Sequence, residues 1–194
     1  SRLAMGRELA HEWSVEADLV CGVPDSGVPA ALGFSRESGV PYGMGFIKNH
    51  YVGRTFINPD PVLRERAVSV KLNVLRDEVK GKKVLLIDDS IVRGTTSRRL
   101  VTLMREAGAK KVLFGVVSPP ITHPCYFGID TPVAADLIAH GMNIEAIRAA
   151  LGADDLAYLS LDGLKKAIEK NEGHCLGCLT GRYPIPPHKL RGVE

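Results

Sequence analysis

The run Val84-Leu-Leu-Ile-Asp-Asp-Ser-Ile-Val-Arg-Gly-Thr-Thr96 decides the fold class of this 194-residue chain. Four apolar residues in a row, Val84 to Ile87, are typical of a strand that is covered on both faces of a sheet. Two carboxylates, Asp88 and Asp89, follow this strand, and a small-residue turn at Gly94 leads into a stretch of helical spacing. A strand, an acidic turn and a helix in this order predict one βα unit of a parallel sheet.

The flanking sequence repeats this alternation of short apolar runs and helix-period stretches. We expect further strands at 19–23, 42–47, 112–117 and 156–159, and helices at 1–13, from 28 to about 38, in at least the second half of 63–79, and at 100–107, 134–150 and 161–169. Residues 48–61 are predicted to form a long loop. The pattern indicates one doubly wound α/β domain over 1–172, with a mainly parallel twisted sheet and helices on both faces, followed by a cysteine-containing tail at 173–194.

Composition excludes several classes of protein. Hydrophobic residues make up 45% and charged residues 24% of the chain, as in ordinary globular domains. No apolar stretch approaches the roughly 20 residues of a membrane-spanning helix, and residues 1–13 are too polar for a signal peptide. The formal charge of +3 is small and dispersed, which argues against nucleic acid as a partner. We therefore expect a soluble, cytoplasmic protein.

The residues after the central strand suit a phosphorylated sugar bound with a divalent metal. The free N–H groups of a helix N-terminus bind phosphate, Gly94 allows close backbone approach, and the hydroxyls of Thr95 and Thr96 add donors. Asp88 and Asp89 suit sugar hydroxyls or a hydrated Mg²⁺. The alternative from these residues alone is an acidic turn capped by Thr95.

Three other predicted strands end in polar residues. Asp25-Ser-Gly27 follows the first strand, Lys48 the second and Ser118 the fourth. Each is ordinary as a turn residue. Together they place carboxylates, hydroxyls and a cation on one rim of one sheet, which indicates a binding site.

The run 84–96 resembles the 5-phosphoribosyl pyrophosphate (PRPP) signature of type I phosphoribosyltransferases. Segments 22–26, 48–57 and 118–130 further resemble the glutamine PRPP amidotransferases, most closely their iron–sulfur branch, and the resemblance extends from about Met5 to Tyr183. It implies a type I phosphoribosyltransferase fold with a flexible lid loop. It also implies the reaction of PRPP with ammonia, taken from glutamine in the full enzyme, to give 5-phosphoribosylamine and pyrophosphate, the first step of de novo purine biosynthesis.

The resemblance assigns roles to individual residues. Asp88 and Asp89 would hold the ribose hydroxyls and, with Ser26, Mg²⁺. The remaining PRPP-binding positions, which cradle the 5-phosphate, would be Ser90, Arg93, Gly94, Thr95 and Thr96. The catalytic cations and hydroxyl of the lid region would be Lys48, Tyr51, Arg54 and Lys71. His50 stands where the family pattern leads us to expect Arg. From the residues alone, the lid segment also fits a solvated surface excursion.

Three cysteines are candidate metal ligands. Cys175-x-x-Cys178 alone fits a redox pair, half a zinc site or a turn, and zinc could be completed by Cys125 with His123 or His174. The resemblance instead implies that Cys125, Cys175 and Cys178 are thiolates of a 4Fe–4S cluster in the full-length protein. Such a cluster needs four cysteines, so its fourth ligand would lie upstream of this chain.

The fourth cysteine of the chain, Cys21, falls outside this pattern and reads as a buried thiol. The resemblance also implies a separate N-terminal glutaminase domain, which is absent from this chain, so we expect the chain to use free ammonia only. Purine nucleotides are expected inhibitors, and a homo-oligomer is expected.

Two other functions stay open at this stage. One is a PRPP-sensing regulatory protein of the same fold, although neither a winged-helix segment nor a basic stripe is present. The other is a nucleobase salvage phosphoribosyltransferase, whose purine-stacking aromatic residue should follow Val117. Pro119 and Pro120 stand there instead.

Overall fold

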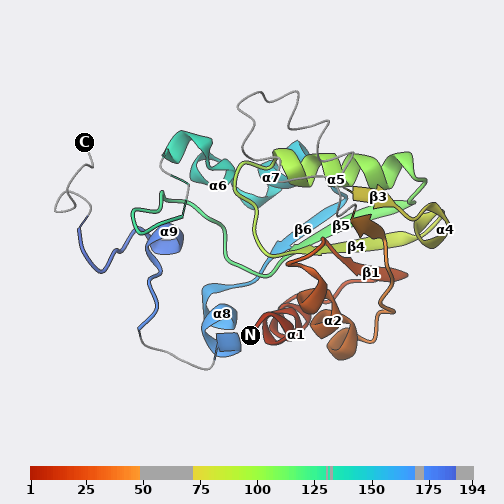
Figure 1. Cartoon of the computed structure of the whole chain (residues 1–194), viewed down its shortest axis with the longest axis horizontal. Helices are drawn as coiled ribbons and strands as arrows, with labels where there is room; N and C mark the ends of the chain where they lie inside the picture. The colour runs from red at the N-terminus through yellow and green to blue at the C-terminus, as the bar shows by residue number, and fades with distance from the viewer. Residues whose placement is uncertain (49–71, 130, 132, 169–172, 187–194) are drawn as a thin grey trace.

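The computed structural model describes residues 1–48, 72–129, 131, 133–168 and 173–186, and it confirms the α/β class. In chain order the elements (Figure 1) are α1 (Arg2–Glu12), β1 (Leu19–Gly22), α2 (Val28–Ser38), β2 (Phe46–Lys48), β3 (Leu72–Val74), α4 (Arg76–Val79), β4 (Lys83–Asp88), α5 (Thr95–Glu106), β5 (Lys111–Val116), the 3₁₀ turn η1 (Ala134–Asp136), α6 (Ile138–Gly141), α7 (Ile144–Leu151), β6 (Asp155–Tyr158), α8 (Leu161–Ile168) and α9 (Gly177–Thr180). No helix among these is long and apolar enough to cross a membrane.

Four parallel strands in the order β1-β4-β5-β6 form the main sheet. On the outer side of β1, Tyr42 forms a parallel bridge to Val20. The chain therefore runs from β1 outward to this edge and then back to β4, so the direction of winding reverses between β1 and β4. Ligands of open α/β sheets bind at the carboxyl ends of the strands at such a reversal. The topology points to the loops after β1 and β4.

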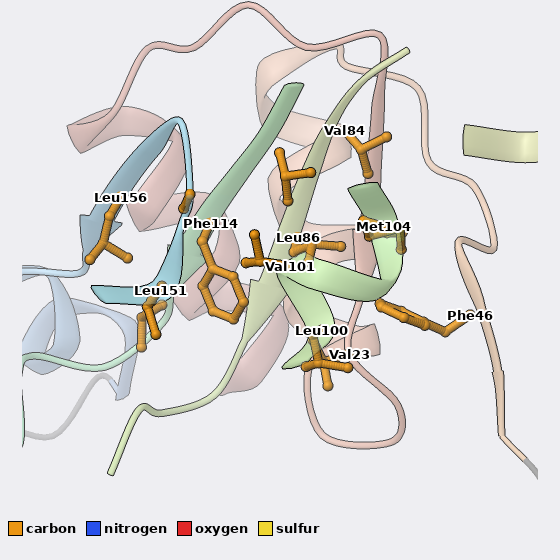
Figure 2. Close-up of a cluster of buried hydrophobic side chains, with 14 of the residues drawn as sticks. Val23, Phe46, Val84, Leu86, Leu100, Val101, Met104, Phe114, Leu151 and Leu156 are labelled. Carbon is orange, nitrogen blue, oxygen red and sulfur yellow. The ribbon is translucent and has the colours of Figure 1, made fainter. Parts of the chain in front are cut away.

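Two hydrophobic cores cover the two faces of the sheet, because successive side chains of a strand point to opposite faces. In β4, Val84 and Leu86 join the core formed with α5 and α7 (Figure 2), whereas Leu85 and Ile87 join the core formed with α1 and α2. The second core contains Trp13, whose ring meets Phe34 edge-on with centroids 6.5 Å apart. Both cores fix the position of β4, the strand that ends at Asp88.

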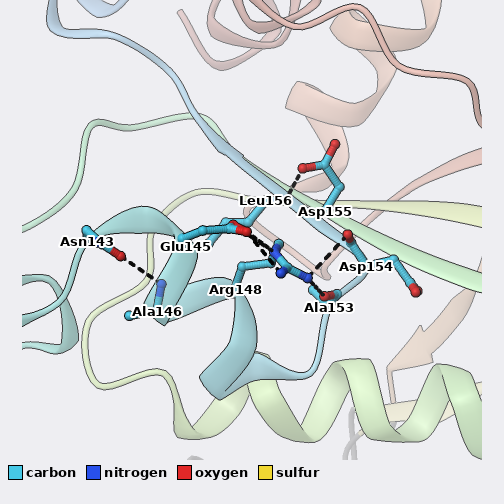
Figure 3. A network of polar contacts seen from close by, with 8 residues as sticks. All are labelled: Asn143, Glu145, Ala146, Arg148, Ala153, Asp154, Asp155 and Leu156. Atoms are coloured by element: carbon cyan, nitrogen blue, oxygen red, sulfur yellow. Dashed lines mark hydrogen bonds and ion pairs between the residues drawn. The ribbon is translucent and has the colours of Figure 1, made fainter.

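Helix α7 is fastened to the loop before β6 by one arginine (Figure 3). The guanidinium of Arg148 donates to both carboxylate oxygens of Glu145 at 2.9–3.2 Å and to the carbonyl of Ala153 at 3.1 Å. Asn143 caps the helix by accepting from the amide of Ala146. These contacts hold the far edge of the sheet together, away from the reversal point.

The prediction of one strand over 42–47 is wrong. Only Tyr42 reaches the main sheet, and Phe46–Lys48 pairs in antiparallel fashion with Leu72–Val74 in a separate two-stranded sheet. The reason is the pair Gly43 and Gly45: a Cβ on Gly45 would stand 2.6 Å from the sulfur of Cys21, so this segment lies too close to the core for the regular side chains of a strand.

The prediction of a helix in the second half of 63–79 is also largely wrong. The described part contains the strand β3 and only the short helix α4. Leu72 is buried and Asn73 exposed, which is the alternation of a half-covered strand rather than helical periodicity. Of the loop predicted over 48–61, Lys48 lies in β2, and 49–61 lie outside the described residues together with the first part of the predicted helix.

Candidate active site at the carboxyl ends of β1 and β4

The loop after β1 lies directly against the end of β4. The amide of Val23 donates to the carbonyl of Ile87 at 2.8 Å. A Cβ on Gly27 would stand 2.2 Å from the same carbonyl oxygen, so only glycine allows this approach. The turn that contains Asp25 and Ser26 is therefore held against the end of β4.

Asp88 is a buried carboxyl group, with 8% of its surface exposed. Burial, and after it the charge of neighbouring Asp89, raise its pKa to about 7, although the amide of Asp89 partly offsets this by donating to Oδ1 at 2.8 Å. Asp89 is half-buried, accepts from the hydroxyl of Ser90, and lies 3.8 Å from a guanidinium nitrogen of Arg2. Two adjacent carboxylates, one of them buried, form a site that favours a cation.

This pair of carboxylates fits Mg²⁺. Magnesium prefers oxygen ligands and is commonly held by one or two carboxylates, with its remaining ligands coming from water and substrate phosphates. Asp88 and Asp89 supply these two carboxylates. Ser26 is half-buried in the adjoining turn and can supply a hydroxyl on the same rim.

Gly94 directly precedes helix α5 at the end of the loop at 88–96. It adopts the left-handed conformation with φ of +77° and stands at the N-cap position. Thr95 is therefore the first residue of the helix rather than its cap, and the capping alternative for Thr95 is not what the structure shows. Thr95 and Thr96 are both exposed at this helix end. The loop presents the free amides and hydroxyls that phosphate binding requires.

Three contacts join the loop at 88–96 to the segment 134–141. The amide of Ile138 donates to the carbonyl of Val92 at 2.9 Å, and Nη2 of Arg93 lies 2.8 Å from Oδ2 of Asp136. The side chain of Ile138 fills the space beside Gly94, where an added Cβ would stand 2.6 Å from its Cδ1. Sequence reasoning missed Asp136 and Ile138, because they lie about 40 residues along the chain inside a predicted helical stretch.

Lys48 reaches the site from a different sheet than expected. It ends β2, which is not part of the four-stranded sheet, yet its ammonium group pairs with the carboxylate of Asp25 in the loop after β1. The structure thus brings Lys48 to the rim together with Asp25, a residue whose pairing the sequence did not reveal. The other three residues of the predicted lid set, Tyr51, Arg54 and Lys71, lie outside the described residues.

Ser118 follows β5 on the same rim. Its Oγ is buried, and no hydrogen-bond partner is found for it among the described residues. The loop that it opens carries two aromatic residues, Tyr126 and Phe127. Both rings contact Tyr183 in the C-terminal tail, with centroids 5.1 and 6.3 Å away.

The three candidate ligand cysteines lie in one region formed by this loop and the tail. The amides of Thr122 and His123 both donate to the carbonyl of Cys178 at 3.0 Å, which joins α9 to the loop. Burial raises the pKa of Cys178, and the neighbouring thiols of Cys125 and Cys175 add to the effect. The structure therefore brings Cys125, Cys175 and Cys178 near one another, and α9 is a helix that the aperiodic sequence did not predict.

These cysteines do not by themselves fit a metal cluster. No group of three or more His, Cys, Asp or Glu side chains arranged to hold a metal is found in the described part of the chain. A 4Fe–4S cluster also needs four thiolates. The fourth cysteine of the chain cannot serve, because Cys21 is 1% exposed inside the sheet core and burial raises its pKa to about 12. This confirms the prediction that Cys21 is a buried thiol.

Comparisons with known proteins identify the family of the chain. Residues 6–122, more than half of the chain, match the phosphoribosyl transferase domain family, and the chain belongs to that family. Within it, the chain is similar to amidophosphoribosyltransferases. It is 53% identical over 189 residues to that of Bacillus subtilis and 54% identical over 188 residues to that of Archaeoglobus fulgidus, in both cases covering 95% of this chain.

Two solved structures extend the similarity to three dimensions. Glutamine PRPP amidotransferase from B. subtilis, complexed with ADP and GMP, superposes with a TM-score of 0.84 at 52% identity over 94% of this chain. A structure described as the allosteric regulatory enzyme of purine biosynthesis gives a TM-score of 0.86 at 49% identity over the whole chain. The chain spans 40–41% of the length of these two curated relatives and 41–42% of the two solved chains.

Proposed function

We propose that this chain is the phosphoribosyltransferase part of an amidophosphoribosyltransferase, with the domain at 1–172 and the cysteine-containing tail at 173–194. The observation that carries the proposal is the juxtaposition of Asp88 and Asp89 with the N-terminus of α5 at the reversal point of the sheet. Ammonia attacks C1 of PRPP with inversion, the bond from C1 to the pyrophosphate oxygen breaks, and its electron pair leaves with pyrophosphate. The new ammonium group loses a proton to give 5-phosphoribosylamine.

The proposal assigns a role to each site residue that the structure describes. Asp88 and Asp89 orient the ribose through its hydroxyls and stabilise the positive charge that develops on the ring as pyrophosphate departs. The loop from Ser90 to Thr96 binds the 5-phosphate through its amides and hydroxyls and so fixes C1 relative to the leaving group. Bound Mg²⁺, held by the two carboxylates with Ser26 close by, would neutralise charge on the pyrophosphate.

Lys48 is the one residue of the predicted catalytic set that lies among the described residues. In the structure it is paired with Asp25 in the loop after β1. We assign it to the pyrophosphate, where an ammonium group stabilises negative charge. Tyr51, Arg54 and Lys71 complete this set in the proposal, as a lid that excludes water from the reacting atoms.

The positions of the aromatic residues disfavour a nucleobase salvage enzyme. Such an enzyme needs an aromatic ring available for stacking near the end of β5. Tyr126 and Phe127, the aromatic residues of that loop, instead contact Tyr183 of the tail. A PRPP-sensing regulator would share the binding site, and turnover alone separates it from the enzyme.

The partners and cofactors follow from the same proposal. We assign glutamine hydrolysis to a glutaminase domain of the full-length protein, and to this chain only the ammonia-dependent reaction. Purine nucleotides are proposed inhibitors at the PRPP site, in line with the relative solved with ADP and GMP. We also propose that the protein is cytoplasmic and forms a homo-oligomer. An iron–sulfur cluster is proposed for the full-length protein alone, and no step of the reaction is assigned to it.

The test is release of pyrophosphate from PRPP with Mg²⁺, measured in parallel with ammonia and with glutamine. We expect release with ammonia and none with glutamine. Asp88→Asn and Asp89→Asn are each expected to lower the rate by about 10²-fold or more, whereas Asp162→Asn on α8 should leave it unchanged. Intact PRPP binding without release under either condition contradicts the enzyme and supports the regulator.

A further inference from the structure

The segment 134–141, which contains η1 and α6, makes three different contacts with the loop at 88–96, called the phosphate loop below. It donates a backbone hydrogen bond to the carbonyl of Val92, it holds the guanidinium of Arg93 through Asp136, and it fills the space beside Gly94 with the side chain of Ile138. The three contacted residues are consecutive and lead directly into α5. No single motif in the sequence links the two segments.

The Arg93–Asp136 pair is poorly placed to serve stability. Its side chains are 44% and 46% exposed, and ion pairs of that exposure contribute little to folding, because water screens them. A distance of 2.8 Å nevertheless gives the guanidinium a defined position at the edge of the loop. The contact therefore serves to fix the position of the Arg93 guanidinium, and contributes little to the free energy of folding.

The loop needs such a constraint. Gly94 has φ of +77°, a conformation that glycine leaves readily because it has no Cβ. The amides around it must point together at one phosphate, and a small displacement of a binding group weakens a multidentate contact strongly. Ile138 limits movement of Gly94 from one side, and Asp136 limits movement of Arg93 next to it.

We infer that Asp136 and Ile138 are positioning residues for the 5-phosphate of the substrate: Asp136 holds Arg93, and Ile138 holds Gly94, in the conformation that binds phosphate. This inference rests on the proposed function, because it takes PRPP as the ligand. It assigns to the segment 134–141 an effect on the 5-phosphate end of the substrate and none on the pyrophosphate end, to which the proposed function assigns Lys48.

Binding of three probes to the protein separates the two ends: PRPP, ribose 5-phosphate and inorganic pyrophosphate, each measured by calorimetry with Mg²⁺. For Asp136→Asn we expect binding of PRPP and ribose 5-phosphate to weaken about fivefold and binding of pyrophosphate to stay unchanged. Asp136→Glu keeps the charge and should stay within about twofold of the unmodified protein. Asp162→Asn, an exposed acid of α8 paired with Lys165, is the matched control.

Ile138→Ala tests the same inference without changing a charge. We expect it to weaken ribose 5-phosphate about as much as Asp136→Asn does, with pyrophosphate again unchanged. Its thermal unfolding is measured alongside, and binding is compared well below the midpoint so that both proteins are folded.

Several outcomes overturn the inference. Equal weakening of all three probes indicates a general structural effect, and unchanged binding of ribose 5-phosphate removes any role in positioning. Tighter binding by Asp136→Asn shows instead that Asp136 competes with the phosphate for Arg93 and does not position it. An unmodified protein that binds none of the probes contradicts the proposed function itself, whereas normal binding by the unmodified protein and both variants contradicts the positioning role alone.

Discussion

The phosphate loop and the cysteine-bearing tail are both short segments rich in chemical groups, but the fold holds them in different ways. The loop at 88–96 continues a central strand whose side chains enter both cores. The tail at 173–186 is joined to the rest mainly through the loop after β5, by hydrogen bonds to the carbonyl of Cys178 and by Tyr183. The loop at 88–96 thus directly extends a strand of the sheet, whereas the tail packs mainly against the loop after β5.

This difference shows in the environment of the reactive groups. Asp88 is almost completely buried and its pKa rises to about 7, whereas Cys178 is half-buried and Cys175 is exposed. Groups attached to a central strand inherit the rigidity and low polarity of the core. Groups on a peripheral tail depend on whatever else binds there.

The largest expected effect comes from adding one methyl group at Gly27, which packs against the end of β4, and at Gly177 of the tail. Gly27→Ala places a Cβ 2.2 Å from the backbone carbonyl of Ile87, which cannot move without disturbing β4. Gly177→Ala meets the ring of Tyr183 at the same distance, but a side chain in the tail can turn aside. We expect losses in the free energy of unfolding of about 3 kcal/mol and about 1 kcal/mol, respectively, in chemical denaturation. Equal losses would show that the tail is as rigid as the sheet.

The next effect is a pH dependence carried by Asp88. In metal-free protein its pKa is about 7, against an ordinary value of 3.8, so between these values the folded state keeps a proton that the unfolded state has lost. Stability therefore falls as pH rises through this window, by at most about 1.4 kcal/mol per pH unit. Asp88→Asn lacks the group and should be the more stable protein at pH about 8, with a flatter profile.

The matched variant in the tail is Cys178→Ser. The pKa of Cys178 is raised above its ordinary value of 9.0, so this thiol stays protonated below pH 8 and its replacement should leave the shape of the profile unchanged. Denaturation of the three proteins from pH about 5 to about 8 is the measurement. A profile for Asp88→Asn that is as steep as that of the unmodified protein would rule out Asp88 as its source.

The smallest effect concerns the attachment of the tail. The hydroxyl of Tyr183 donates to the carbonyl of Pro124 at 2.6 Å, and Tyr183→Phe removes only this bond. We expect a local loss of about 1 kcal/mol, seen as faster amide exchange in 174–183, with exchange in β4 unchanged. Tyr126→Phe keeps the ring contact and the bond to Pro124, and is the control. Faster exchange in β4 as well would mean that tail and sheet open as one unit.

The sequence predicted the sheet well because each central strand is a short apolar run with one dominant interpretation. β4, β5 and β6 and the helices α1, α2, α5 and α8 lie close to their expected ranges. The run 84–96 also carried the family assignment, since a strand end, an acidic pair and a helix start follow one another without a gap.

Tertiary contacts account for the errors. The segment at 42–47 has strand-like composition, but the close packing of Gly45 on Cys21 separates Tyr42 from β2. Asp136 and Ile138 could not be recognised because their partners, Arg93 and Gly94, are far away along the chain. Lys48 was placed on the correct rim for an incorrect reason, since it arrives from the two-stranded sheet. The roles of the site residues stay predictions until binding is measured.

The single tryptophan of the chain gives this two-faced architecture a spectroscopic consequence. Trp13 lies in the core of α1 and α2, whereas the side chain beside the phosphate loop, Ile138, packs with the core on the opposite face of the sheet. The fluorescence of Trp13 is therefore expected to report the unfolding of the core of α1 and α2, and to change little when a ligand binds the phosphate loop. Intrinsic fluorescence and calorimetry consequently read two nearly independent properties of the same molecule, the integrity of its scaffold and the occupancy of its site.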